Sequence, residues 1–193
     1  MYAAKAEFLE KGFQTASLRT IVKEAGVTTG ALYGYYGSKE AIFDALVEEC
    51  YTHFLSAYRN ALDDFDRLPI EQQPERMSTV SQACLEELLF YMFNHREAFH
   101  LLLLCSEGTH YSSMKEELVQ LEVNATHRYY LVLEKLGTPA PQIDPRLEHI
   151  LVTGLMNAYF EMIIHDMPLA DAQQYLGELH SFYSAGWLKI MGQ

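Results

Sequence analysis

Hydroxyl, glycine, tyrosine and lysine residues lie close together near the N-terminus and could bind the backbone of a nucleic acid. Thr28, Thr29 and Gly30 come first, and Tyr33 and Lys39 follow within ten residues. Short side chains beside exposed backbone N–H groups can approach phosphates and base edges. A tyrosine hydroxyl and an ammonium group can donate to phosphate oxygens. The segment therefore predicts contacts with nucleic acid.

Two short helices are needed to position these side chains. Ser17 is a good N-cap for a first helix, and its apolar residues lie at helical spacing: Leu18, Ile21, Val22 and Ala25. Gly26 ends that helix, Thr28 caps a second one running to about Tyr35, and Ser38 caps a longer third one. This is the layout of a helix-turn-helix, which places its second helix in the major groove of DNA.

The stretch KGFQTASLRTIVKEAGVTTGALYGYYGSKEAIFDAL resembles the signature of the TetR family of bacterial transcription regulators. The matching residues keep fixed spacings over about residues 8–47 and are Gly12-Phe13, Ser17, Ala25-Gly26-Val27, Thr28, Gly30, Leu32-Tyr33, Tyr35-Tyr36 and Ser38-Lys39-Glu40. The resemblance implies an all-α homodimer whose reading heads bind a palindromic DNA operator. It also implies that a small-molecule effector controls binding, more often of a repressor than of an activator. The DNA-binding residues that it implies are Ser17, Thr28, Thr29, Gly30, Tyr33, Gly34 and Lys39.

Charge and three departures from the family pattern predict weak, salt-sensitive DNA binding. The chain has a net charge of −12, and residues 1–49 contribute five Lys/Arg against seven Asp/Glu. Thr29, Gly34 and Gly37 stand where the family often has lysine, a larger side chain, and proline or lysine, so each removes a backbone contact. Binding dominated by phosphate contacts weakens steeply as salt rises. The first helix also begins at Met1 without a cap, as in a chain that lacks upstream residues with further contacts.

The rest of the chain predicts helices and no strands. Apolar residues recur at spacings of three and four, and no stretch alternates long enough for a strand. After the helix that begins at Ser38, helices are expected at 75–94, 97–105, 111–136, 144–165 and 170–190. The prediction is an all-α protein of about nine helices, divided into a DNA-binding domain at 1–47 and an effector-binding and dimerisation domain at 48–193.

Aromatic residues are numerous in the C-terminal part and could line an apolar pocket. The segment after the apolar run 101–104 adds polar groups that could lie at a pocket mouth or form a solvated loop. The candidate effector-pocket residues are Phe90, Phe99, Glu107, His110, Tyr129 and Tyr159.

The last two predicted helices are apolar on more than one face, which indicates burial on two sides. Pairing with a second copy would bury them, although burial within one chain would do so too. The candidate dimer-interface residues are Leu151, Gly154, Leu155, Ala158, Leu179, Phe182, Tyr183 and Trp187.

No catalytic or metal motif is recognisable. The eight histidines form no pair spaced by four, and neither GxSxG nor HExxH occurs. We therefore expect no enzyme activity, no cofactor and no metal. The three cysteines are far apart, no secretory signal is visible and no apolar run reaches the length of a membrane helix, so a cytoplasmic protein is expected. The alternatives are a helical ligand-binding protein or enzyme with a vestigial reading head, and an interaction module that docks through its acidic body.

Overall fold

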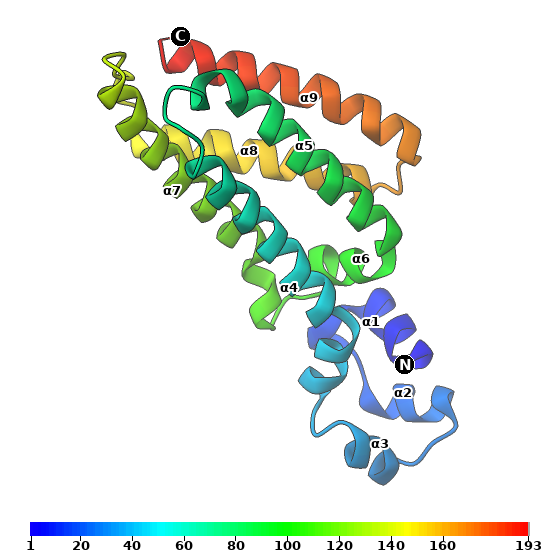
Figure 1. Cartoon of the computed structure of the whole chain (residues 1–193). Coiled ribbons are helices and arrows are strands. Elements are labelled where there is room, and N and C mark those ends of the chain that lie inside the picture. Colours follow the sequence, from blue (N-terminus) through cyan, green and yellow to red (C-terminus); the bar gives the residue numbers. More distant parts are fainter. Residues whose placement is uncertain (193) are drawn as a thin grey trace. The chain divides into compact units, whose positions relative to one another are not determined.

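The computed structural model describes residues 1–192 and contains nine α-helices, one short 3-10 helix and no strand over that range (Figure 1). The helices are α1 (Tyr2–Thr15), α2 (Leu18–Ala25), α3 (Thr29–Tyr35), α4 (Lys39–Asp66), α5 (Gln73–Asn94), α6 (Arg96–Leu104), η1 (His110–Ser113), α7 (Met114–Lys135), α8 (Pro145–Ile164) and α9 (Leu169–Ile190). The all-α prediction is confirmed for the described residues.

The observed helix bounds follow the local capping chemistry. Gly12 interrupts α1 with φ 72° and ψ 163°, a conformation that glycine adopts at low cost, and the helix is kinked there. The expected helix over 111–136 instead begins with the 3-10 turn η1. Thr109 explains this difference, because its Oγ1 accepts a hydrogen bond from the N–H of Tyr111 at 3.2 Å and tightens the chain before α7.

The helices divide into two compact units, and α4 contributes residues to both. The first unit comprises residues 1–53 and 95–114. Phe8, Phe13 and Phe43 form its aromatic core, with ring centroids 5.2–6.0 Å apart. The N–H of Phe13 donates to the carbonyl of Cys105 at 2.8 Å and ties the end of α1 to the end of α6. This core is the support from which α2 and α3 extend.

The second unit comprises residues 54–94 together with residues from 115 onward. In it α9 packs against both α5 and α8. Tyr159 of α8 is buried, and its hydroxyl donates to the carbonyl of Leu85 in α5 at 2.8 Å. The two units are defined by packing, whereas the expected division at 47/48 concerns function and stays a prediction.

Across residues 1–192, none of the helices combines the length and the apolar character that crossing a bilayer requires.

Candidate nucleic-acid interface and ligand cavity

Helix α2 is fixed at its N-terminus and along one face. The Ser17 Oγ accepts a hydrogen bond from the N–H of Thr20 at 3.4 Å, and the Ser17 N–H donates to Oε1 of Glu7 at 2.9 Å. These bonds satisfy backbone donors that a helix start otherwise leaves without partners. Ile21 and Val22 bury their side chains in the first unit. The cap and the buried face therefore fix the position of α2 and of the turn that follows it.

The turn between α2 and α3 depends on Gly26 and Thr28. Gly26 has φ 65° and ψ 27°, in the left-handed region where a side chain is strained even though the surrounding space is open. Thr28 is extended, and its Oγ1 accepts a hydrogen bond from the N–H of Ala31 at 3.1 Å. The sequence thus sets both the direction of the turn and the first residue of α3.

Helix α3 is exposed except at Leu32, which is half-buried. It buries none of its residues, and Thr28, Thr29 and Gly30 before and at its start are exposed. Tyr33 is 49% exposed and Tyr35 is 86% exposed. An isolated helix of seven residues is not stable in water, so its capped start and the turn before it must maintain it. An exposed and capped short helix of this kind can enter a groove of DNA without rearranging the core.

The Lys39 side chain makes hydrogen bonds within the protein. Its Nζ donates to the carbonyls of Gln14 at 3.1 Å and Ala16 at 3.3 Å, and it lies 4.7 Å from the centre of the Phe13 ring. An ammonium group has three N–H donors, so one remains after these two bonds. Lys39 therefore holds the segment between α1 and α2 and keeps one donor for another partner.

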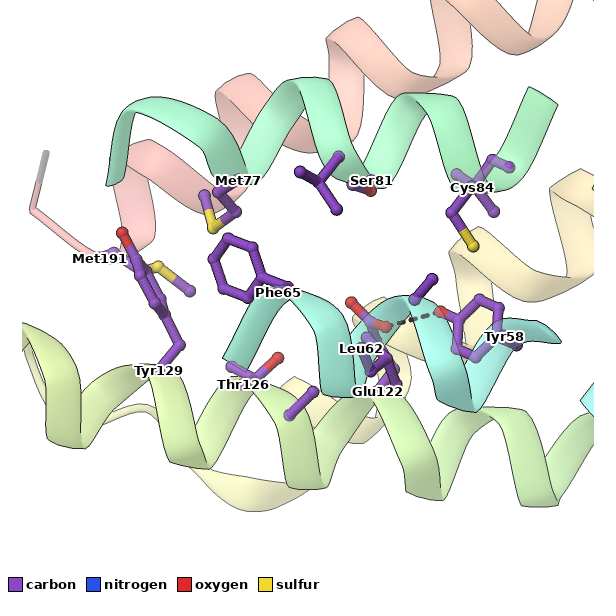
Figure 2. A pocket seen from close by; sticks show the side chains of 14 residues that line it. Tyr58, Leu62, Phe65, Met77, Ser81, Cys84, Glu122, Thr126, Tyr129 and Met191 are labelled. Carbon is purple, nitrogen blue, oxygen red and sulfur yellow. Dashed lines mark hydrogen bonds between the residues drawn. The ribbon is translucent and has the colours of Figure 1, made fainter. Parts of the chain in front are cut away.

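The second unit contains a cavity of about 90 Å³ that is lined by residues of α4, α5 and α7 and by Met191 after α9 (Figure 2). Its lining residues are Tyr58, Ala61, Leu62, Phe65, Met77, Val80, Ser81, Cys84, Leu85, Glu122, Ala125, Thr126, Tyr129 and Met191. Most of them are apolar or aromatic. An apolar cavity with a few polar groups is typical of small-molecule sites.

Glu122 and Tyr58 form the polar end of this cavity. The Tyr58 hydroxyl donates to Oε2 of Glu122 at 2.6 Å. Burial raises the pKa of Glu122, although the Tyr58 hydrogen bond and the charge of Arg128 act in the opposite direction. Burial and the nearby Glu122 carboxylate also raise the pKa of the Cys84 thiol to about 12, so Cys84 is an unreactive thiol at neutral pH.

Comparison with known proteins identifies the N-terminal part of the chain. Residues 1–46 match the family model "Bacterial regulatory proteins, tetR family", and this range contains the capped helices, the Gly26 turn and Lys39. The chain belongs to the TetR family. That family consists of helix-turn-helix transcriptional regulators and not of enzymes.

Individual relatives of this TetR-family chain support the assignment over part of their length. The uncharacterised HTH-type transcriptional regulator YvdT of Bacillus subtilis is 30% identical over 108 residues, which are 56% of this chain and 50% of YvdT. The HTH-type transcriptional repressor KstR2 of Mycobacterium tuberculosis is 33% identical over 60 residues, which are 31% of this chain and 30% of KstR2. The chain thus matches half or less of the length of these curated relatives.

The fold of the whole chain is similar to a solved structure of the fatty acid degradation regulator FadR from Bacillus halodurans. The TM-score is 0.58, the sequence identity is 17%, and the match covers 94% of each chain. At this identity the likeness concerns the fold alone. It agrees with an N-terminal helix-turn-helix followed by a helical C-terminal part.

The predicted DNA-binding residues all lie in the first unit, on or beside α2, α3 and the start of α4. Thr28, Thr29, Gly30, Tyr33 and Gly34 are exposed together at α3. Ser17 and Lys39 are half-buried and also have the structural roles described above. Contact of these seven residues with DNA stays a prediction.

Of the six predicted effector-pocket residues, the structure brings only Tyr129 to the lining of this cavity. Phe99 is buried in the first unit, and Tyr159 is buried with its hydroxyl on Leu85. Phe90 is 55% exposed on α5. Glu107 and His110 are exposed in the first unit, where the His110 ring contacts that of Tyr111.

The predicted dimer-interface residues lie on α8 and α9 of the second unit. Phe182 is 73% exposed, and the others are partly exposed: Leu151, Gly154, Leu155, Ala158, Leu179, Tyr183 and Trp187. Gly154 has a neighbour inside its own chain, because a Cβ there would lie 2.8 Å from the Tyr183 hydroxyl oxygen. The close approach at Gly154 is therefore made by Tyr183 in this chain, and pairing with a second copy stays a prediction.

Neither Glu122 nor Tyr58 is among the residues predicted from the sequence. A signal for Glu122 was present, since it interrupts the apolar helical stripe formed by Leu118, Ala125, Tyr129 and Leu133 of α7. A carboxylate at a position that should face the core needs a partner, and this need marks a site. Tyr58 lies on α4, before the aromatic-rich C-terminal part on which the pocket prediction rests.

Proposed function

We propose that this protein is a homodimeric DNA-binding transcription regulator in the bacterial cytoplasm. It acts as a repressor that leaves a palindromic operator when a small molecule occupies the cavity of the second unit. The observation that carries the proposal is that α3 buries none of its residues and follows a fixed turn, with exposed hydroxyl groups at its start and the exposed Tyr33 beyond them. The TetR-family match covers this region.

The chemistry of α3 suits a duplex partner, with phosphate contacts setting position and short side chains in the groove. Tyr33 and the remaining N–H of Lys39 can donate to phosphates, while Thr29 and Gly30 allow the backbone to approach base edges. No lysine or arginine lies on α3 itself. Few ionic contacts therefore hold each reading head, and a dimer with two heads is needed for a stable complex.

An exposed apolar surface on α8 and α9 supports the homodimer. Ile150 is 63% exposed and Phe182 is 73% exposed. An apolar groove beside Phe182 is lined by Leu151, Tyr183, Ala185, Gly186, Trp187 and Ile190. Large apolar patches of this kind mark interaction surfaces. A second copy would place two reading heads on one operator, as two-fold symmetric sites require.

The cavity supports control by an effector, and α4 supplies the connection. This helix contributes Tyr58 and Phe65 to the cavity and Lys39 to the first unit. An occupant that moves Tyr58 therefore acts on the helix whose first turn is bonded to the start of the helix-turn-helix. The effector can weaken DNA binding by no more than the difference between its affinities for the DNA-binding dimer and for the released dimer. The repressor sense is supported by the name of the relative KstR2.

Gel-shift titration tests the proposal, using DNA selected from a random-sequence library by the wild-type protein. We expect Tyr33→Ala to reduce affinity about tenfold or more, because it removes a phosphate contact from each head of the dimer. The matched control is Phe90→Ala, an exposed aromatic on α5, and it should bind as the wild type does. Failure of the wild type to retain any selected DNA, or equal retention by Tyr33→Ala, would contradict the proposal.

A further inference from the structure

The charge of the cavity is set by a single residue. Glu122 is the only carboxylic acid among the lining residues, and none of them is a lysine, arginine or histidine. The charge of Arg128 acts on Glu122 from outside the lining, where its guanidinium is paired with Asp66. The cavity thus offers one acidic group to an occupant and no basic group.

The Glu122 carboxylate has one oxygen available for an occupant. Its Oε2 accepts the Tyr58 hydroxyl, while its Oε1 has no hydrogen-bond partner among residues 1–192. Figure 2 shows this second oxygen directed away from Tyr58, toward the space that holds Phe65 and Met77. Glu122 is half-buried on α7 and lines the cavity.

A carboxylate in such surroundings needs a positive or donating partner. Burying an ionised carboxylate without one is costly, and an incoming carboxylate or phosphate would add like charge beside it. An ammonium group supplies both the missing charge and the missing hydrogen bond. Charge-assisted bonds of this kind are about twice as strong as neutral ones.

The other walls suit the apolar part of an amine. Phe65 and Tyr129 present aromatic rings, which attract cations at their faces. Met77 and Met191 are flexible and can adjust to shape. The volume of about 90 Å³ is below the ~150 Å³ that admits benzene in an engineered cavity, so a short aliphatic chain fits without rearrangement.

We propose that the occupant of this cavity is a small lipophilic cation, of the class of alkylamines protonated at neutral pH, with its ammonium on Glu122 and its chain against Phe65, Met77 and Met191. The inference rests on the proposed function, in which this cavity is the effector site. It adds the chemical class of the effector and excludes small carboxylates and phosphates.

Three probes of equal chain length and different charge test this inference: n-butylammonium, 1-butanol and butyrate. The full-length protein carries ¹³C-labelled methionine methyl groups, and the shifts of Met77 and Met191 report occupancy of the cavity. We expect n-butylammonium to bind about tenfold tighter than 1-butanol, as one charge-assisted hydrogen bond predicts, and butyrate not to bind. Lowering the pH should weaken n-butylammonium and leave 1-butanol unchanged, because protonated Glu122 no longer attracts a cation.

Two isosteric variants separate Glu122 from overall charge. Glu122→Gln keeps an oxygen for the Tyr58 hydroxyl and should remove the tenfold preference for n-butylammonium. Glu134→Gln removes the same charge from an exposed position on α7 and should change nothing. Equal binding of the three probes, tighter binding of butyrate, absence of binding by n-butylammonium, or an unchanged preference in Glu122→Gln would overturn the inference.

The failure of this inference and the failure of the proposed function are distinguishable. Gel shifts with selected DNA are run in parallel at saturating n-butylammonium. Binding of the amine at Glu122 without any change in DNA affinity would confirm the ligand class and remove the effector role. DNA binding by a protein whose cavity rejects the amine would leave the DNA-binding proposal intact.

Discussion

Replacing Lys39 by methionine tests whether this lysine supports the helix-turn-helix as well as contacting DNA. Methionine keeps the apolar stem and removes the ammonium that joins the carbonyls of Gln14 and Ala16 and lies over Phe13. A charge-assisted hydrogen bond contributes about 1.5–3 kcal/mol. A cation–π contact at an exposed site contributes about 0.5–1 kcal/mol. Because one of the two bonds is exposed to solvent, we expect Lys39→Met to reduce the free energy of unfolding by about 2 kcal/mol.

Urea denaturation followed by circular dichroism measures this loss, and gel shifts over a range of salt measure the phosphate contact. Lys23→Met is the control, because Lys23 is an exposed lysine of α2 with no side-chain bond among the described residues, and it should cost less than about 0.5 kcal/mol. The third N–H of Lys39 should contact a phosphate. The slope of the logarithm of the DNA-binding constant against the logarithm of the salt concentration should therefore become less steep in Lys39→Met, by about one per lost contact. If Lys39→Met is as stable as Lys23→Met, the bonds to Gln14 and Ala16 do not hold the helix-turn-helix as argued.

Three further outcomes follow from the geometry. Gly26→Ala should lose about 1–2 kcal/mol of stability, because the φ of 65° at this position strains a side chain. Gly34→Ala, inside α3, should instead gain about 0.5–1 kcal/mol. Thermal or urea unfolding of both variants checks that the two changes in stability have opposite signs. Phe182→Glu should convert a dimer to a monomer in sedimentation velocity, and Leu131→Glu, which changes an exposed leucine on α7, should not; a dimer in both variants would remove α9 from the interface. Burial raises the pKa of Glu122 in the folded state, so folding takes up a proton and this residue's contribution to stability falls as the pH rises above about 4.5. The free energy of unfolding of Glu122→Gln should therefore equal that of the wild type near pH 4 and exceed it at pH 7. A constant difference in this free energy across the pH range would contradict the assignment.

The reading head could be predicted in detail because its determinants are local. The Ser17 and Thr28 caps and the left-handed Gly26 each act within a few residues, and each is found where the sequence places it. The family resemblance added fixed spacings that periodicity alone does not provide. The intramolecular bonds of Lys39 were not predictable, because its carbonyl partners are more than twenty residues earlier in the chain.

The cavity could not be predicted from aromatic content. Phe99 and Tyr159 are aromatic because they fill cores, whereas the cavity is defined by where α4, α5 and α7 leave space. Such a space depends on the packing of three helices distant in sequence. The informative sign was a single misplaced carboxylate, Glu122, in an apolar stripe.

The central claim is that α3 of this TetR-family protein reads DNA as one of two symmetric heads, and hydroxyl-radical footprinting on DNA selected by the wild-type protein tests it most directly. We predict two protected patches related by two-fold symmetry, centred one helical turn or about 34 Å apart, with the protection lost in Tyr33→Ala. A single asymmetric patch, or a two-fold pattern that persists unchanged without the Tyr33 side chain, would contradict the claim.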